Sequence, residues 1–218
     1  MRKILFTSVI VLLAIGFFAI GYASDKPEQQ ALKDYQRIQK QFEKSVSAQA
    51  SIDNLKLSNF SIPIFFTLTA EEIASYEGKE LSDILQPSDQ WLWFMQDNGE
   101  TKGIVIADSK EPIQMGGENY SKDLMKLYKA IQQNDSKDND VRYFEFQGGG
   151  IFLSVDKNKE EVWLTSRAAE LLNLSPYKKL SPETVLKKMK ERITNTKDLW
   201  EDIWVNSSEQ EGTGEQYE

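Results

Sequence analysis

Charged and apolar positions are distributed unevenly along the chain, and the N-terminal end is the most extreme part. Arg2 and Lys3 are followed by twenty uncharged residues, Ile4 to Ala23, of which twelve are Ile, Leu, Val or Phe. At helical rise such a run spans about 30 Å, the thickness of the hydrocarbon core of a bilayer. Positive residues stay on the cytoplasmic side. The pattern therefore predicts a signal peptide or N-terminal membrane anchor over 1–23 and an extracytoplasmic location for the rest.

Two fates of this segment are open. Gly21-Tyr22-Ala23 has the small-x-small pattern that a signal peptidase accepts, so the chain can be secreted after cleavage near Ala23. The apolar run is longer than a usual signal core, and Ile20 lies almost at the cleavage site. Those two features favour a retained anchor, in which residues 4–23 hold the protein in the membrane.

The next periodic stretch, residues 27–50, predicts an amphipathic helix within a segment 24–51. Its apolar residues recur at steps of three or four, with charged and amide side chains between them. They are Leu32, Tyr35, Ile38, Phe42 and Val46. A stripe of this width suits a helix that packs on its own domain, which we favour. It also suits a stalk that self-associates with a second chain.

Local signals place the elements that follow. Residues 62–68 predict a strand, and Thr69 with Glu72 has the spacing of a capping box at the start of a helix. Asn98-Gly99 lies between two apolar runs, which is the strongest short-range indication of a β-hairpin, here over 91–108. A further helix is expected from Ser121, as its N-cap, to Gln133.

The second half of the chain predicts a three-stranded meander over 141–165 with its first turn at Gly148-Gly149-Gly150. Helices are expected over 167–174 and from Pro182, with a break at 195–197. A last helix then carries apolar residues at helical spacing, and 206–218 reads as a disordered acidic tail. Helices and hairpin-joined strands without strict βαβ alternation indicate a single α+β domain, 24–205, with a mainly antiparallel sheet.

Composition excludes several classes of function. Removing Arg2 and Lys3 from the 26 basic residues leaves 24 against 34 acidic ones, a net charge of −10 for the exported part. That balance argues against nucleic acid as a partner. The chain has no His and no Cys, so it cannot form a Ser-His-Asp site, a Cys-His site, a nitrogen-sulfur zinc site or a disulfide. We predict no cofactor and no metal, and a role that is more binding than catalytic.

A few residues are candidates for ligand binding. Trp91 and Trp93 share one face of a strand, as stacking on a sugar requires, although such pairs more often pack a sheet. Arg142 and Glu145 lie in an aromatic strand beside the glycines, where a carboxylate can serve as an acid or remain a surface charge. Gly149 lets the backbone approach a ligand, or simply forms a turn.

Three functional hypotheses remain. The first is a non-enzymatic, exported or membrane-tethered domain that binds an envelope protein or cell-wall polymer. The second is a carboxylate-based hydrolase of envelope polymers, and the third is a small-ligand or peptide sensor. The long apolar start and the lysine-rich composition are typical of a bacterial chain.

Overall fold

The structure is a computed structural model that describes residues 26–42, 52–134, 139–157 and 159–210. The predicted membrane segment 1–23 and part of the predicted helix 27–50 lie outside these ranges. Within the described ranges, no helix combines the length and apolarity that crossing a bilayer requires.

The strands of the described residues form one mixed sheet with the order β5-β4-β3-β2-β6-β7-β8, and β1 pairs with β3. Every neighbouring pair in this sheet is antiparallel except β2 and β6, which are parallel. The bounds are β1 (Lys56–Leu57), β2 (Ile62–Thr67), β3 (Leu85–Asp97), β4 (Glu100–Ala107), β5 (Pro112–Gly116), β6 (Asp140–Phe146), β7 (Gly149–Asp156) and β8 (Lys159–Leu164). The prediction of a single-domain α+β fold with a mainly antiparallel sheet is confirmed.

The predicted hairpin is formed by β3 and β4. Asn98 and Gly99 both have positive φ, 48° and 84°, as a two-residue hairpin turn with the strand twist requires. β3 begins at Leu85, six residues before the expected strand, because it pairs with β2 as well as β4. The prediction missed β5, which returns after a tight turn in which Asp108 accepts hydrogen bonds from the backbone N–H groups of Lys110 and Glu111.

The helices agree with the local signals at some ends and differ at others. They are α1 (Pro27–Phe42), α3 (Ala70–Ser75), η1, a 3₁₀ turn (Ser82–Ile84), α4 (Glu118–Asn134), α5 (Ser166–Leu172) and α6 (Pro182–Gln210). The capping box of α3 is confirmed, because the Thr69 side chain accepts from Glu72 N–H and the Glu72 side chain accepts from Thr69 N–H. Ser121 is not the N-cap of α4: it lies inside the helix, fully buried, with its Oγ donating to the Glu118 carbonyl.

The expected break at 195–197 is wrong, because α6 is continuous from Pro182 to Gln210. The hydroxyls of Thr194 and Thr196 donate to the carbonyls four residues earlier, and an Asn inside a helix costs well under about 1 kcal/mol. Residues 206–210 of the expected tail are therefore helical, and 211–218 lie outside the described residues.

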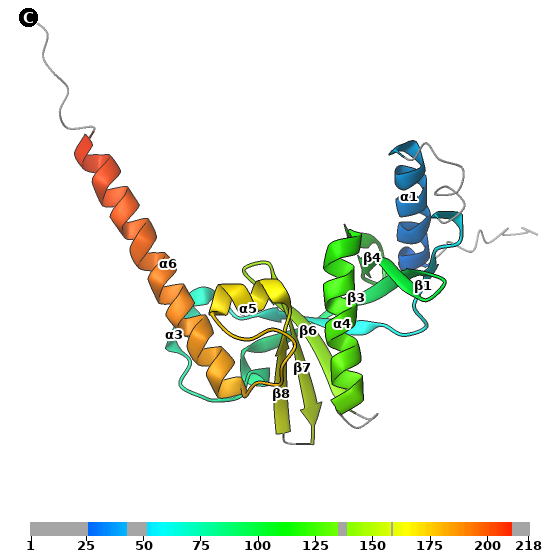
Figure 1. The fold of residues 1–218 in the computed structure, drawn as a ribbon. Helices are drawn as coiled ribbons and strands as arrows, with labels where there is room; N and C mark the ends of the chain where they lie inside the picture. The colour runs from blue at the N-terminus through cyan, green and yellow to red at the C-terminus, as the bar shows by residue number, and fades with distance from the viewer. Residues whose placement is uncertain (1–25, 43–51, 135–138, 158, 211–218) are drawn as a thin grey trace, which may run out of the picture.

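Helices cover both faces of the sheet (Figure 1). α4 lies across one face, where its Leu124 and Leu127 pack on residues such as Ile64 and Phe94. On the other face, α1 covers the end formed by β3, β4 and β5, with Ala31 and Leu32 in one cluster with Val105. The remaining helices α3, α5 and α6 cover the end formed by β6, β7 and β8.

The joint between the two ends of the sheet positions the candidate site. β2 has a register shift between Pro63 and Phe65 where it pairs with β3. Its ladder with β6 contains a single residue pair, Ile64 opposite Tyr143. The two ends of the sheet are therefore joined by one ladder pair, and both of its residues belong to the cluster under α4.

Candidate functional site

A cleft of about 290 Å³ opens at this joint between β2 and β6. Its lining comes from five strands, β2 to β6, and combines aromatic rings, two amides and one carboxylate. The lining residues are Ile64, Phe65, Phe66, Thr67, Gln90, Ile106, Gln114, Tyr143 and Glu145. Ile64, Ile106 and Tyr143 also belong to the core cluster under α4, so the floor of the cleft is continuous with the core.

Glu145 is held in place by two tyrosines. The hydroxyls of Tyr120, in the first turn of α4, and Tyr143 lie 2.7 and 2.5 Å from Glu145 Oε1. The two hydroxyls also contact each other, so two protons are shared among three oxygens. Burial, together with the neighbouring carboxylate, raises the pKa of both Tyr120 and Tyr143 well above 10. Both phenols therefore stay protonated and orient the carboxylate.

Three polar groups of the cleft are available to a ligand. Among the described residues, Glu145 Oε2 and the side-chain amides of Gln90 and Gln114 have no hydrogen-bond partner, while Glu145 Oε1 is already used. Phe66 lies at the same cleft with 51% of its surface exposed. An exposed phenyl ring beside a carboxylate and two amides can stack on a ligand and bond to its polar edge.

Arg142 and Glu145 are not brought together, because three steps along a strand place them on opposite faces of the sheet. The Arg142 guanidinium lies 5.0 Å from the centroid of the Phe65 ring and forms an ion pair with Asp140 at 2.7 Å. Its charge is therefore paired with Asp140, and it contacts the cleft only through the ring of Phe65, which is also a lining residue. Of the candidates predicted in this strand, only Glu145 lines the cleft.

Trp91 and Trp93 also lie outside the cleft. Leu92 and Phe94 are buried under α4, so alternation places both tryptophans on the face that α1 covers. Trp93 packs beside Met95 in the cluster under α1, whereas Trp91 is 43% exposed. The two indoles share a face of β3, as the sequence indicates, but the structure assigns them different surroundings.

The three glycines lie near the site and differ in what surrounds them. Gly148 takes positive φ in the turn, whereas Gly149 and Gly150 are already in β7. A Cβ on Gly149 would lie 2.7 Å from the Ala168 Cα, so this glycine admits α5 to the sheet. A Cβ on Gly150 would lie 3.0 Å from the Tyr143 ring. Because Gly150 is opposite Glu145 in the ladder, it makes room for the ring that orients the carboxylate.

Sequence reasoning identified only Glu145 among the residues of the site, and four of the missed residues carry its polar or exposed aromatic groups. Phe66, Gln90, Gln114 and Tyr120 come from separate elements, and nothing in their spacing links them to Glu145. The one available indication of the site was that Tyr143 and Glu145 share a face of β6 by strand alternation. Alternation does not show which face of the strand is exposed to solvent.

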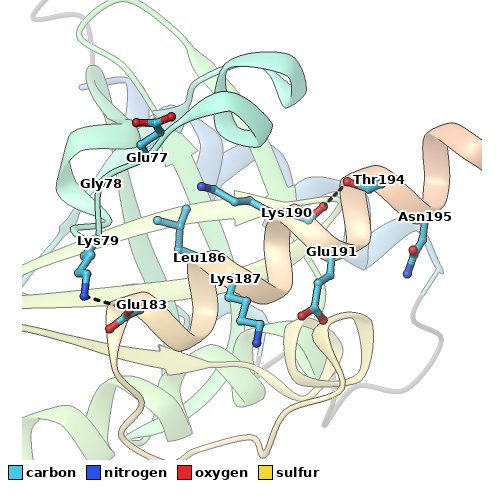
Figure 2. A pocket seen from close by; sticks show the side chains of 10 residues that line it. All are labelled: Glu77, Gly78, Lys79, Glu183, Leu186, Lys187, Lys190, Glu191, Thr194 and Asn195. Atoms are coloured by element: carbon cyan, nitrogen blue, oxygen red, sulfur yellow. Dashed lines mark hydrogen bonds and ion pairs between the residues drawn. The ribbon is translucent and has the colours of Figure 1, made fainter.

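A second and larger cavity, of about 730 Å³, lies along α6 beside the segment that follows α3. Figure 2 shows Lys79 reaching toward Glu183, with Glu77 on the same segment as Lys79 and the remaining charged side chains on α6. Its charged groups are largely engaged: Lys79 pairs with Glu183 at 3.2 Å, Lys190 donates to the Tyr76 carbonyl, and Glu191 pairs with Lys188. A surface whose charges satisfy each other offers a ligand less than the Glu145 cleft.

Comparisons with known proteins assign no family. No protein-family model, curated protein or solved structure significantly matches the chain. Within the described residues, no group of three or more acidic side chains is arranged to hold a metal ion.

Proposed function

We propose that the chain is a non-enzymatic, exported or membrane-tethered domain that binds a polar partner at the cell envelope through the Glu145 cleft. The observation that carries this proposal is the geometry of Glu145. Two protonated tyrosines hold one of its carboxylate oxygens, and Glu145 lines a cleft together with two unengaged amides and the exposed ring of Phe66. A fixed carboxylate in such surroundings is a preorganised hydrogen-bond acceptor.

Binding is favoured over glycoside hydrolysis by the number of carboxylates. Hydrolysis by paired carboxylates needs two of them, about 5 to 9.5 Å apart. Among the described residues that line the cleft, Glu145 is the only acidic one, and its tyrosine neighbours stay protonated because their pKa values are raised.

Binding of a partner at an open surface is also favoured over enclosure of a small apolar ligand. Phe66, Gln114 and Glu145 are exposed, so the cleft is accessible to a chain or polymer that lies on the sheet. A sensor pocket of the enclosed type would bury most of its ligand among apolar side chains.

The envelope location rests on the sequence of residues 1–23, with the bulk of the chain outside the cytoplasm. The location is tested by adding protease to protoplasts, which lack the wall but keep an intact membrane. We expect digestion of the domain without lysis, whereas protection until lysis would contradict the location. Mass measurement of the mature chain decides between a retained anchor and cleavage near Ala23.

The binding proposal is tested by retention on envelope fractions. Full-length protein in neutral detergent is mixed with wall and membrane fractions, and the bound share is compared for Glu145→Gln, Phe66→Leu and two control variants. Glu170→Gln removes the same charge from an exposed position of α5. Phe42→Leu makes the same substitution as Phe66→Leu at another exposed phenylalanine, at the end of α1. We expect retention to fall for the cleft variants alone. Equal retention of all four variants would contradict the proposed function.

A further inference from the structure

We infer that the Glu145 cleft takes a basic side chain, arginine above all, presented by a protein or peptide partner. This inference rests on the proposed function and adds the chemical class of the ligand. It follows from three features of the cleft: its charge, its exposed ring and its unengaged acceptors.

The charge of the cleft is negative and uncompensated. Among the described residues that line it, Glu145 is the only charged one. The nearest candidate cation in the same strand, Arg142, lies on the opposite face and pairs with Asp140. A cationic ligand therefore meets a carboxylate without displacing a resident partner, and it supplies a charge-assisted hydrogen bond. An anionic ligand would be repelled.

The ring of Phe66 favours a planar cation over a compact one. A guanidinium stacks on an aromatic face and keeps its N–H groups free at the edge, whereas an ammonium is a strongly hydrated point charge. With half of its surface exposed beside the cleft, Phe66 is available for such stacking.

The number of acceptors also matches arginine. A guanidinium carries five N–H donors in a fixed plane. The cleft offers Glu145 Oε2 and the amide oxygens of Gln90 and Gln114, none of which has a partner among the described residues. At about 290 Å³, the cleft is at the small end of ligand sites, which suits one side chain of a larger partner.

The inference is tested with the full-length protein in neutral detergent and the peptide Gly-Gly-Arg-Gly-Gly, observed by ligand NMR titration. The matched peptide carries citrulline, which has nearly the shape of arginine and no charge. We expect the arginine peptide to bind roughly tenfold more tightly than the citrulline peptide, as a charge-assisted bond of about 1.4 kcal/mol implies. A lysine peptide is expected to fall between them.

Variants connect the preference to the cleft. Glu145→Gln is expected to remove the preference for arginine, and Phe66→Leu to weaken arginine binding about two- to fivefold. Glu170→Gln and Phe42→Leu carry the same changes outside the cleft and are expected to leave binding unchanged. If Glu145→Gln and Glu170→Gln bind the arginine peptide equally, the attraction comes from net charge alone and the inference is wrong.

Other outcomes separate this inference from the proposed function. Tight binding of an N-acetylglucosamine oligomer that is lost in Glu145→Gln, with no preference for arginine, would overturn the inference and leave a saccharide-binding cleft. Retention on envelope fractions that depends on Glu145, without arginine preference in the peptides, also overturns the inference alone. Retention on envelope fractions that does not depend on Glu145 would contradict both the inference and the proposed function.

Discussion

Gly149→Ala is, among the described glycines, the substitution whose added methyl group comes closest to backbone atoms. The added Cβ would lie 2.7 Å from the Ala168 Cα and 3.0 Å from the Ala168 N and Cβ. Carbon atoms normally approach to about 3.5–4.0 Å, so α5 must move outward by about 0.8 Å or more. The contact involves the backbone of α5, so no side-chain rotation relieves it. Ala168, Ala169 and Leu172 hold that helix in the core, and all three are affected.

The expected loss in free energy of unfolding follows from the cost of adding methyl groups to close-packed protein cores. A methyl group forced into a close-packed interior costs about 1–3 kcal/mol. Replacing glycine also restricts the unfolded chain, which favours folding by about 0.4–1 kcal/mol wherever the native backbone is compatible. Gly117→Ala provides the matched control, because a Cβ there meets nothing within 4 Å. The difference in free energy of unfolding between the two variants therefore isolates the clash.

The assay is urea unfolding of the full-length protein in neutral detergent, followed by tryptophan fluorescence. We expect Gly117→Ala to unfold within about 0.5 kcal/mol of the wild type and Gly149→Ala to lose about 1–3 kcal/mol. For a domain of this size that loss corresponds to a melting temperature lower by about 2–12 °C. Equal stability of the two variants would refute the role of close packing. Normal stability with lost envelope retention would instead support contact between Gly149 and a ligand.

Three further changes probe local features by the same unfolding assay. Thr69→Ala removes the cap of α3 and is expected to cost about 1 kcal/mol, which Thr69→Ser largely restores. Gly99→Val strains a turn residue at φ 84° and is expected to cost about 1–2 kcal/mol, whereas an unchanged midpoint would contradict that turn geometry. Because the pKa of Tyr143 is raised well above 10, folding retains a proton that the unfolded chain releases above pH 10. Stability is thus full below about pH 10 and falls as pH rises above that value, and Tyr143→Phe is expected to flatten that fall.

Features determined by neighbouring residues were predictable from the sequence. The turn at Asn98-Gly99 needs positive φ at two adjacent positions, and the cap of α3 needs two side chains three residues apart. Such signals are complete within a few residues, so tertiary structure adds nothing to them. The antiparallel pairing of β3 with β4 follows from that turn.

Element ends and the site depend on partners that are distant in the chain. β3 extends back to Leu85 because β2 pairs with it, and Ser121 is buried inside α4 because that helix packs on the sheet. α6 also continues through residues that sequence alone marks as weak helix formers, with the hydroxyls of Thr194 and Thr196 bonded to carbonyls of their own helix. In each case packing or local bonding overrides a modest propensity.

A difference of one residue in the position of the turn at the glycine run changes which residues surround the site. The expected turn begins at Gly148, and the actual turn is Gln147-Gly148, only one residue earlier. That shift moves Gly149 and Gly150 into β7, with Gly150 opposite Glu145 and Gly149 opposite Phe146. Successive strand residues face opposite sides of a sheet. Gly149 therefore leaves space for α5 to pack closely, and Gly150 leaves space for the ring of Tyr143. The orientation of Glu145 therefore depends on a register that the sequence leaves undetermined, because three identical residues carry no information about which of them turns.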